Sequence, residues 1–208
     1  MMRNKIRIGI VVIAVVVVNA LLIYNVSGIN STHKDELELP SMELATGDLV
    51  FRNGHGLISR MFQNCSLKEK KYGHTGIVLI KDNIPYVVHV QQDRPGPALM
   101  IEPLSQFWNK SICNEGAVYR LDFDNNSKFR FASVLQTHIK KQITFDAKFD
   151  MEEHTHVYCS EWIRDLVVET TGDSGYFPIS VAGDFRYIAP DNLYLNEHAQ
   201  LIYNYSKE

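Results

Sequence analysis

The chain has 208 residues, of which 45% are hydrophobic and 11% aromatic, and its formal net charge is -3. This size and composition fit one globular domain with its own core. The slightly acidic balance excludes the strongly basic surface of a nucleic-acid-binding protein, so no nucleic-acid partner is expected. The sequence also contains no glycine-rich phosphate loop and no internal repeat.

The first 28 residues have the pattern of a membrane anchor. Arg3, Lys5 and Arg7 precede an apolar run from Ile8 to Tyr24 that only Asn19 interrupts. The run is at the short end for a membrane-spanning helix. It is long for the apolar part of a cleaved signal peptide, and no clear cleavage site follows it. The positive residues place the N-terminus in the cytoplasm. We therefore expect a single anchor over residues 1–28 and an extracytoplasmic domain over residues 29–208.

Strands and helices are mixed in the remaining chain. The pattern predicts strands over 47–52, 73–80, 85–91 and 116–123, with 73–80 and 85–91 joined as a hairpin. It predicts helices over 56–63, 104–108, 128–143 and 157–171, the last one ending at Gly172. The tail from Asp173 to Tyr205 is expected to be aromatic and loop-rich. Because strands and helices do not alternate regularly, we expect an α+β fold with a small antiparallel sheet packed against helices.

Cys159 falls where a polar segment changes into the last predicted helix. In the first turn of a helix the backbone N–H groups and the helix dipole lower the pKa of a thiol. The same N–H groups, near Tyr158 and Cys159, can hold an oxyanion. The alternative is that Cys159 is a small buried core residue. Its position by itself leaves both interpretations open.

A cysteine nucleophile needs a base, and His74 and His89 lie on the two strands of the predicted hairpin. If Gly76 pairs with His89, the two imidazoles are diagonal neighbours on one face of the sheet. A shift of one residue in the register would put them on opposite faces. We expect His74 to act as the base and His89 to orient it.

A zinc site is the competing hypothesis. His154 and His156 lie near Glu152, Glu153 and Cys159, and imidazole and thiolate are common zinc ligands. The spacing matches no known closed structural site, so the nucleophile is the favoured interpretation. The other two cysteines, Cys65 and Cys113, are candidates for a disulfide.

Five stretches together resemble a known family. They are GDLVFRNGHGLISRMF, YGHTGIVLI, YVVHV, FDAKFD and YCSEWI, in this order between Leu44 and Leu166. In that order they resemble the circularly permuted papain-like amidases of the NlpC superfamily, specifically the YiiX/YaeF-like group. The resemblance implies a Cys–His–polar triad of Cys159, His74 and His89. Many relatives have an acidic residue at the third position. A histidine there is similar to the lecithin retinol acyltransferase-like branch and orients the base less strongly than a carboxylate.

The resemblance implies a cysteine hydrolase that acts on amide bonds, an amidase or peptidase with cell-wall peptides as candidate substrates. Tyr72 and Tyr158 are candidate substrate-binding and oxyanion-site residues. One alternative is a lipid acyltransferase or thioesterase with the same Cys–His pair, and another is a non-catalytic binding domain on this fold. The expected partners are a peptide, amide or lipid substrate and the membrane, and the chemistry needs no cofactor.

Overall fold

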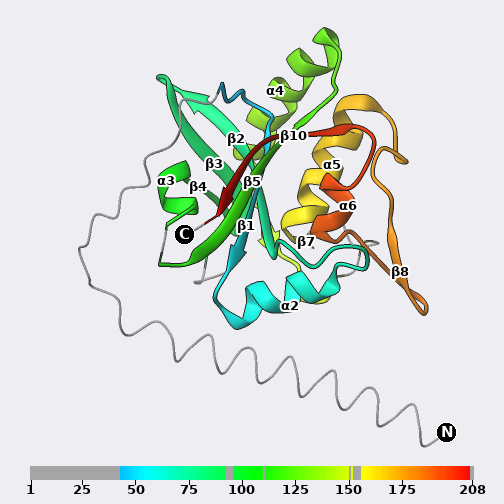
Figure 1. The fold of residues 1–208 in the computed structure, drawn as a ribbon. Helices are drawn as coiled ribbons and strands as arrows, with labels where there is room; N and C mark the ends of the chain where they lie inside the picture. The colour runs from blue at the N-terminus through cyan, green and yellow to red at the C-terminus, as the bar shows by residue number, and fades with distance from the viewer. Residues whose placement is uncertain (1–42, 92–95, 110, 150, 152–155, 207–208) are drawn as a thin grey trace, which may run out of the picture. The chain divides into compact units, whose positions relative to one another are not determined.

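The structure is a computed structural model that describes residues 43–91, 96–109, 111–149, 151 and 156–206 (Figure 1). These residues form an α+β fold with a six-stranded antiparallel sheet and packed helices, which confirms the predicted fold class. The predicted membrane anchor over residues 1–28 lies outside the described residues. Among the helices that are described, none combines the length and the apolar character needed to cross a membrane.

The central sheet has the strand order β10-β5-β1-β2-β3-β4, and all neighbouring strands are antiparallel. Its strands are β1 (Leu49–Gly54), β2 (His74–Lys81), β3 (Ile84–Val90), β4 (Leu99–Pro103), β5 (Cys113–Leu121) and β10 (Ala199–Ser206). Two small sheets accompany it. They are the parallel pair β6 (Thr144–Phe145) and β7 (His156–Val157), and the antiparallel pair β8 (Ser180–Ala182) and β9 (Phe185–Tyr187).

Both faces of the sheet are covered. On one face, residues such as Leu49, Phe51 and Ile77 pack in the main core against α4 (Asn125–Ile139), α5 (Cys159–Thr171) and α6 (Pro190–Tyr194). On the other face, Val50 and Val78 pack against α3 (Leu104–Phe107) and the following Trp108. Figure 1 shows α3 on the opposite side of the sheet from α5 and α6. Since side chains alternate along a strand, even-numbered residues of β1 and β2 lie on the α3 face.

The helices begin and end close to their predicted positions. α2 (Leu57–Cys65) matches the predicted helix over 56–63. α4 begins three residues before its predicted start because the Asp124 carboxylate accepts a hydrogen bond from the Ser127 N–H at 2.6 Å, as a helix N-cap does. α5 begins at Cys159, and Gly172, with a φ of 77°, ends it as the sequence predicts.

The predicted β2–β3 hairpin is confirmed. Asp82 and Asn83 have φ values of 52° and 60°, which suit a two-residue turn between antiparallel strands. Ile77 lies opposite Val88, so the next step of the same register puts Gly76 opposite His89. A Cβ on Gly76 would lie 3.0 Å from the Cβ of His89 and 2.5 Å from the Cγ1 of Val87. Glycine is therefore required here for the strands to approach.

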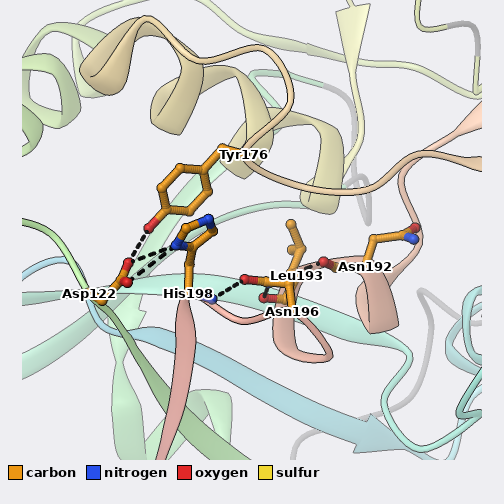
Figure 2. Close-up of polar contacts among 6 residues, drawn as sticks. All are labelled: Asp122, Tyr176, Asn192, Leu193, Asn196 and His198. Carbon is orange, nitrogen blue, oxygen red and sulfur yellow. Dashed lines mark hydrogen bonds and ion pairs between the residues drawn. The ribbon is translucent and has the colours of Figure 1, made fainter.

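The tail after Asp173 is more regular than predicted, because it contains α6 and the eight-residue strand β10. Figure 2 shows how β10 is held at its start: His198 Nδ1 lies 3.2 Å from both carboxylate oxygens of Asp122. The Tyr176 hydroxyl donates to the same carboxylate at 3.1 Å, and its ring stacks on His198. The alternation of β10 is hard to read from the sequence because the register shifts between Leu201 and Tyr203.

Candidate active site

Cys159 is the first residue of α5 and so lies in its first turn, as predicted, and its side chain is 1% exposed. Burial raises the pKa of the Cys159 thiol to about 11, although the backbone N–H groups of Thr75 and Ser160 face the sulfur and lower it. The expectation of a lowered pKa is therefore wrong for this state of the molecule. The desolvation of the charged form outweighs the helix N-terminus. The resting cysteine is a neutral thiol.

His74 and His89 are joined as the predicted register requires. His74 Nε2 lies 2.9 Å from His89 Nδ1, and the two rings are nearly perpendicular. Both side chains are buried. His74 also precedes Thr75, whose N–H faces the sulfur of Cys159. The structure thus brings the predicted base and its orienting residue into direct contact, next to the segment that meets the cysteine.

A carboxylate and a guanidinium extend this pair. Glu102 Oε1 lies 3.2 Å from His89 Nε2 and 3.8 Å from Arg52 Nη1. Arg52 also donates to the Phe107 carbonyl at 2.9 Å and to Gln91 Oε1 at 2.8 Å. The four residues Arg52, His74, His89 and Glu102 therefore form a chain of polar contacts under α3.

The contacts favour one distribution of protons over the ring nitrogens. An ionised Glu102 can only accept, so the His89 nitrogen beside it, Nε2, is the donor. In a neutral His89 the other nitrogen, Nδ1, must then accept from His74 Nε2–H. A neutral His74 with its proton on Nε2 has its lone pair on Nδ1. This is the tautomer that a base with a free Nδ1 requires.

The charges around His74 favour its neutral form. Burial lowers the pKa of His74 well below its ordinary value, and the positive charge of Arg52 and the neighbouring His89 lower it further. Burial works against ionisation of Glu102, but its contact with His89 and the positive charge of Arg52 lower its pKa overall. His74 is therefore neutral and Glu102 is ionised, which are the protonation states used above to assign the tautomers.

Phe107 of α3 forms the wall of this cluster. Its ring stacks on His74 with centroids 5.6 Å apart, and it meets His89 edge-on at 5.3 Å. The Arg52 guanidinium lies over the same ring, 4.3 Å from its centroid. A ring that touches three members of the cluster restricts their rotamers and excludes water from the contacts.

Tyr158 and Tyr72, the candidate oxyanion-site and substrate-binding residues, are both buried. The Tyr158 N–H donates to Glu161 Oε2 at 3.4 Å, and the Tyr158 hydroxyl accepts from the Ile188 N–H at 2.8 Å. The Tyr158 N–H is thus engaged in capping α5. Tyr72 is fully buried, and its ring packs against Phe51 and Tyr194. These contacts are those of a core residue, and a substrate-binding role for Tyr72 stays a prediction.

The other two cysteines differ in their surroundings, because Cys65 is exposed whereas Cys113 is buried close to Arg52 of the cluster. Cys65 and Cys113 are both free thiols, so they do not form the disulfide that the sequence allows. Within the described ranges, no group of three His, Cys, Asp or Glu side chains is arranged to hold a metal ion. His154, Glu152 and Glu153 lie outside those ranges, so the zinc hypothesis stays a prediction.

Glu102 and Arg52 are the members of the cluster that the sequence did not reveal. Arg52 lies opposite His74 in the β1–β2 pair, and Glu102 lies opposite Val87, two residues from His89, in the β3–β4 pair. Both therefore share one sheet face with the histidines. The sequence of β1 does carry a signal for Arg52, because the arginine stands at an inward-facing position among apolar residues. β4 is not among the strands predicted above, so the sequence offered no register that would place Glu102.

Comparison with known proteins identifies the family and a shared fold. No curated protein matches the chain. Among solved structures, it is similar to the crystal structure of metalloprotein yiiX from Escherichia coli O157:H7, with a TM-score of 0.62 and 16% identity. The match covers 78% of this chain and 98% of that chain, and it shows a shared fold. Residues 43–174, well over half of the chain, match a family described as permuted papain-like amidase enzymes. The chain therefore belongs to the YaeF/YiiX, C92 family of permuted papain-like amidases.

Proposed function

We propose that this protein is a cysteine hydrolase of amide bonds in which Cys159 is the nucleophile, His74 the base and His89 the orienting residue. The observation that carries the proposal is the 2.9 Å contact between His74 Nε2 and His89 Nδ1. It leaves His74 Nδ1 as the basic nitrogen, beside the strand segment whose Thr75 N–H faces the Cys159 sulfur. Family membership supports the same reaction class.

The reaction starts from two neutral groups. Since the resting thiol and His74 are both uncharged, the thiol proton moves to His74 Nδ1 as the sulfur attacks the carbonyl carbon. An S–C bond forms and the carbonyl oxygen becomes an oxyanion. The C–N bond then breaks, and the His74 imidazolium gives its proton to the leaving amine. Water, deprotonated by His74, attacks the thioester, releases the carboxylic acid and restores the thiol.

The oxyanion would be held by backbone N–H groups at the start of α5. Cys159 and Ser160 have N–H groups that already face the sulfur, so an oxygen on the attacked carbon would lie close to them. The Tyr158 N–H could join them only after release from Glu161, to which it donates in the resting state. We assign the main contribution to the Cys159 N–H.

The second candidate is a lipid acyltransferase or thioesterase. The histidine at position 89 supports it, because the acyltransferase-like branch of the superfamily has a histidine there. The predicted anchor supports it too, since a domain tethered outside the cytoplasm would meet both lipids and cell-wall peptides. The chemistry is the same up to the acyl-enzyme, except that an alcohol or thiol leaves in place of the amine.

Trapping of the acyl-enzyme tests the proposal. The full chain is mixed with peptide p-nitroanilides, phosphatidylcholine vesicles or an acyl thioester, quenched in acid and analysed by mass spectrometry. Acyl transfer from the peptide to Cys159 supports the amidase, and transfer only from the lipid or thioester supports the second candidate. If no donor gives an acyl-enzyme or turnover, both enzyme proposals fail and the remaining interpretation is a non-catalytic binding domain. Cys159→Ala must abolish the signal, whereas Cys65→Ser, at an exposed free thiol, must not.

A further inference from the structure

Four polar side chains lie on one face of four adjacent strands. Arg52 of β1, His74 of β2, His89 of β3 and Glu102 of β4 follow one another across the sheet in strand order. Arg52 lies directly opposite His74, while His74, His89 and Glu102 are related by diagonal steps. Diagonal neighbours on one face are within side-chain reach. The register of the four strands therefore places these four side chains in one row across the sheet.

The row is buried more deeply than ordinary surface ion pairs. The His89 side chain is 1% exposed, the Arg52 side chain 10% and the Glu102 side chain 21%. A carboxylate so enclosed needs partners that offset the loss of water. His89 and Arg52 are those partners. Gln91 and the Phe107 carbonyl, which accept from Arg52, fix the guanidinium that faces Glu102.

We propose that Glu102, held by Arg52, is a positioning residue for the base. It accepts the hydrogen bond from His89 Nε2–H and so keeps His89 in the tautomer whose Nδ1 accepts from His74. This inference rests on the proposed function. A carboxylate in the third position of a triad has only acceptor sites, but a histidine has two tautomers, one of which would reverse the bond to His74. Glu102 removes that second tautomer.

The tautomers of His74 and His89 can be measured directly in the full chain. Two-bond ¹H–¹⁵N NMR spectra distinguish protonated from bare imidazole nitrogens, with His89→Gln used for assignment. Near neutral pH we expect Nε2 of both histidines to be protonated and Nδ1 of both to be bare. A wild-type spectrum that shows the proton on His89 Nδ1 would by itself overturn the inference, and no substitution of Glu102 is needed for this test.

Two substitutions at Glu102 separate the hydrogen bond from the charge. Glu102→Met removes the acceptor at similar volume, and Glu102→Gln keeps a neutral acceptor. With p-nitrophenyl acetate as the acyl donor, we expect Glu102→Met to lower kcat/KM by about 10- to 100-fold, as loss of a supporting partner typically does. Glu102→Gln should recover part of that loss. The spectrum of Glu102→Met should show mixed tautomers of His89.

A matched control is available on α5. Glu169 Oε2 lies 2.9 Å from His138 Nε2, a histidine–glutamate contact outside the cluster, so Glu169→Gln should leave kcat/KM and both tautomers unchanged. If Glu102→Met keeps wild-type kinetics and tautomers, the inference fails while the proposed function stands. If the wild type shows no acyl transfer but has the expected tautomers, the proposed function fails and the positioning role of Glu102 is kept.

Discussion

His74 Nε2 and His89 Nδ1 lie 2.9 Å apart in a buried contact, so one nitrogen donates and the other accepts. The contact restrains the orientation of the His74 ring, and in the proposed mechanism it leaves His74 Nδ1 as the basic nitrogen. This relationship replaces the thiolate–imidazolium pair that a helix-start cysteine suggests. In the proposed mechanism both the His74 imidazole and the Cys159 thiol are neutral before the reaction.

Replacement of His89 should therefore disable the base without unfolding the protein. We expect His89→Leu to lower kcat/KM for p-nitrophenyl acetate by at least about 10²-fold, because loss of the orienting partner leaves His74 free to rotate and to change tautomer. His138→Leu is the matched control, since His138 is also buried and paired with a glutamate but lies outside the cluster. Equal losses in both variants would contradict an orienting role.

The pH dependence of acylation follows from the two pKa shifts. The lowered pKa of His74 moves the acid limb of kcat/KM below about 6.5, because the base stays neutral at lower pH than a free histidine. The thiol, with a pKa raised to about 11, adds no inflection near the free-thiol value of about 8.5. The rate measured from pH 5 to 10 should form a plateau above the acid limb.

The same profile in His74→Gln gives the control. Without the base, only the thiolate reacts, so the residual rate should rise steadily toward the pKa of the thiol. A wild-type acid limb centred near 8.5 would show that the thiolate attacks unaided, contrary to the proposed mechanism.

Glu161, two residues after Cys159, should make stability depend on pH. Its burial raises the pKa of the carboxyl to about 8, and Asp165 and Asp146 add to the rise. Between about pH 4.5 and 8 the folded chain holds a proton that the unfolded chain has lost, so the free energy of unfolding falls as pH rises through this window. Glu161→Gln keeps the acceptor for the Tyr158 N–H and removes the titration.

Urea unfolding at several pH values measures this effect. The gain from Glu161→Gln should be small near pH 4.5 and should grow toward pH 8, by about 1.4 kcal/mol for each pH unit of the shift that is realised. Glu169→Gln, on the same helix, should show the opposite sign, because His138 lowers the pKa of Glu169. A gain from Glu161→Gln that does not change with pH would contradict the assigned cause.

Gly76 should be intolerant of any side chain. A Cβ there would lie 2.5 Å from Val87 Cγ1 and 2.9 Å from the Val88 carbonyl oxygen. We expect Gly76→Ala to lower the free energy of unfolding by about 1–3 kcal/mol through overpacking, and to displace His89 from His74. Gly56→Ala should cost less, since a Cβ at Gly56 would meet no atom within 4 Å. Similar losses in the two variants would show that the close approach at Gly76 is unimportant.

Much of the fold could be predicted because its local signals are strong. The two-residue turn at Asp82 and Asn83 fixes the hairpin register, and that register alone brings His74 to His89. Gly172 ends α5 with a positive φ. β10 escaped prediction because its bulge interrupts the alternation, and its pairing with β5 is set by distant contacts such as Asp122 with His198.

The parts of the site that the sequence missed depend on tertiary structure. The pKa of Cys159 is set by how deeply α5 is buried against the sheet, and no local pattern reports that depth. Glu102 lies more than ten residues from His89 in sequence and joins it only through the β3–β4 register. The positions of Cys159 at a helix start and His74 on a hairpin can be recognised from local sequence. Their pKa values cannot, because burial in the folded domain sets them.

The most direct measurement is the pre-steady-state burst of p-nitrophenolate from p-nitrophenyl acetate, recorded for the full chain and for His74→Gln. The wild type should release a stoichiometric burst and carry the acetyl group on Cys159 by mass spectrometry. His74→Gln should slow that burst by at least about 10²-fold at pH 7, because the buried thiol then has no base. Acetylation of Cys159 at the same rate in both proteins would contradict the Cys159–His74 mechanism.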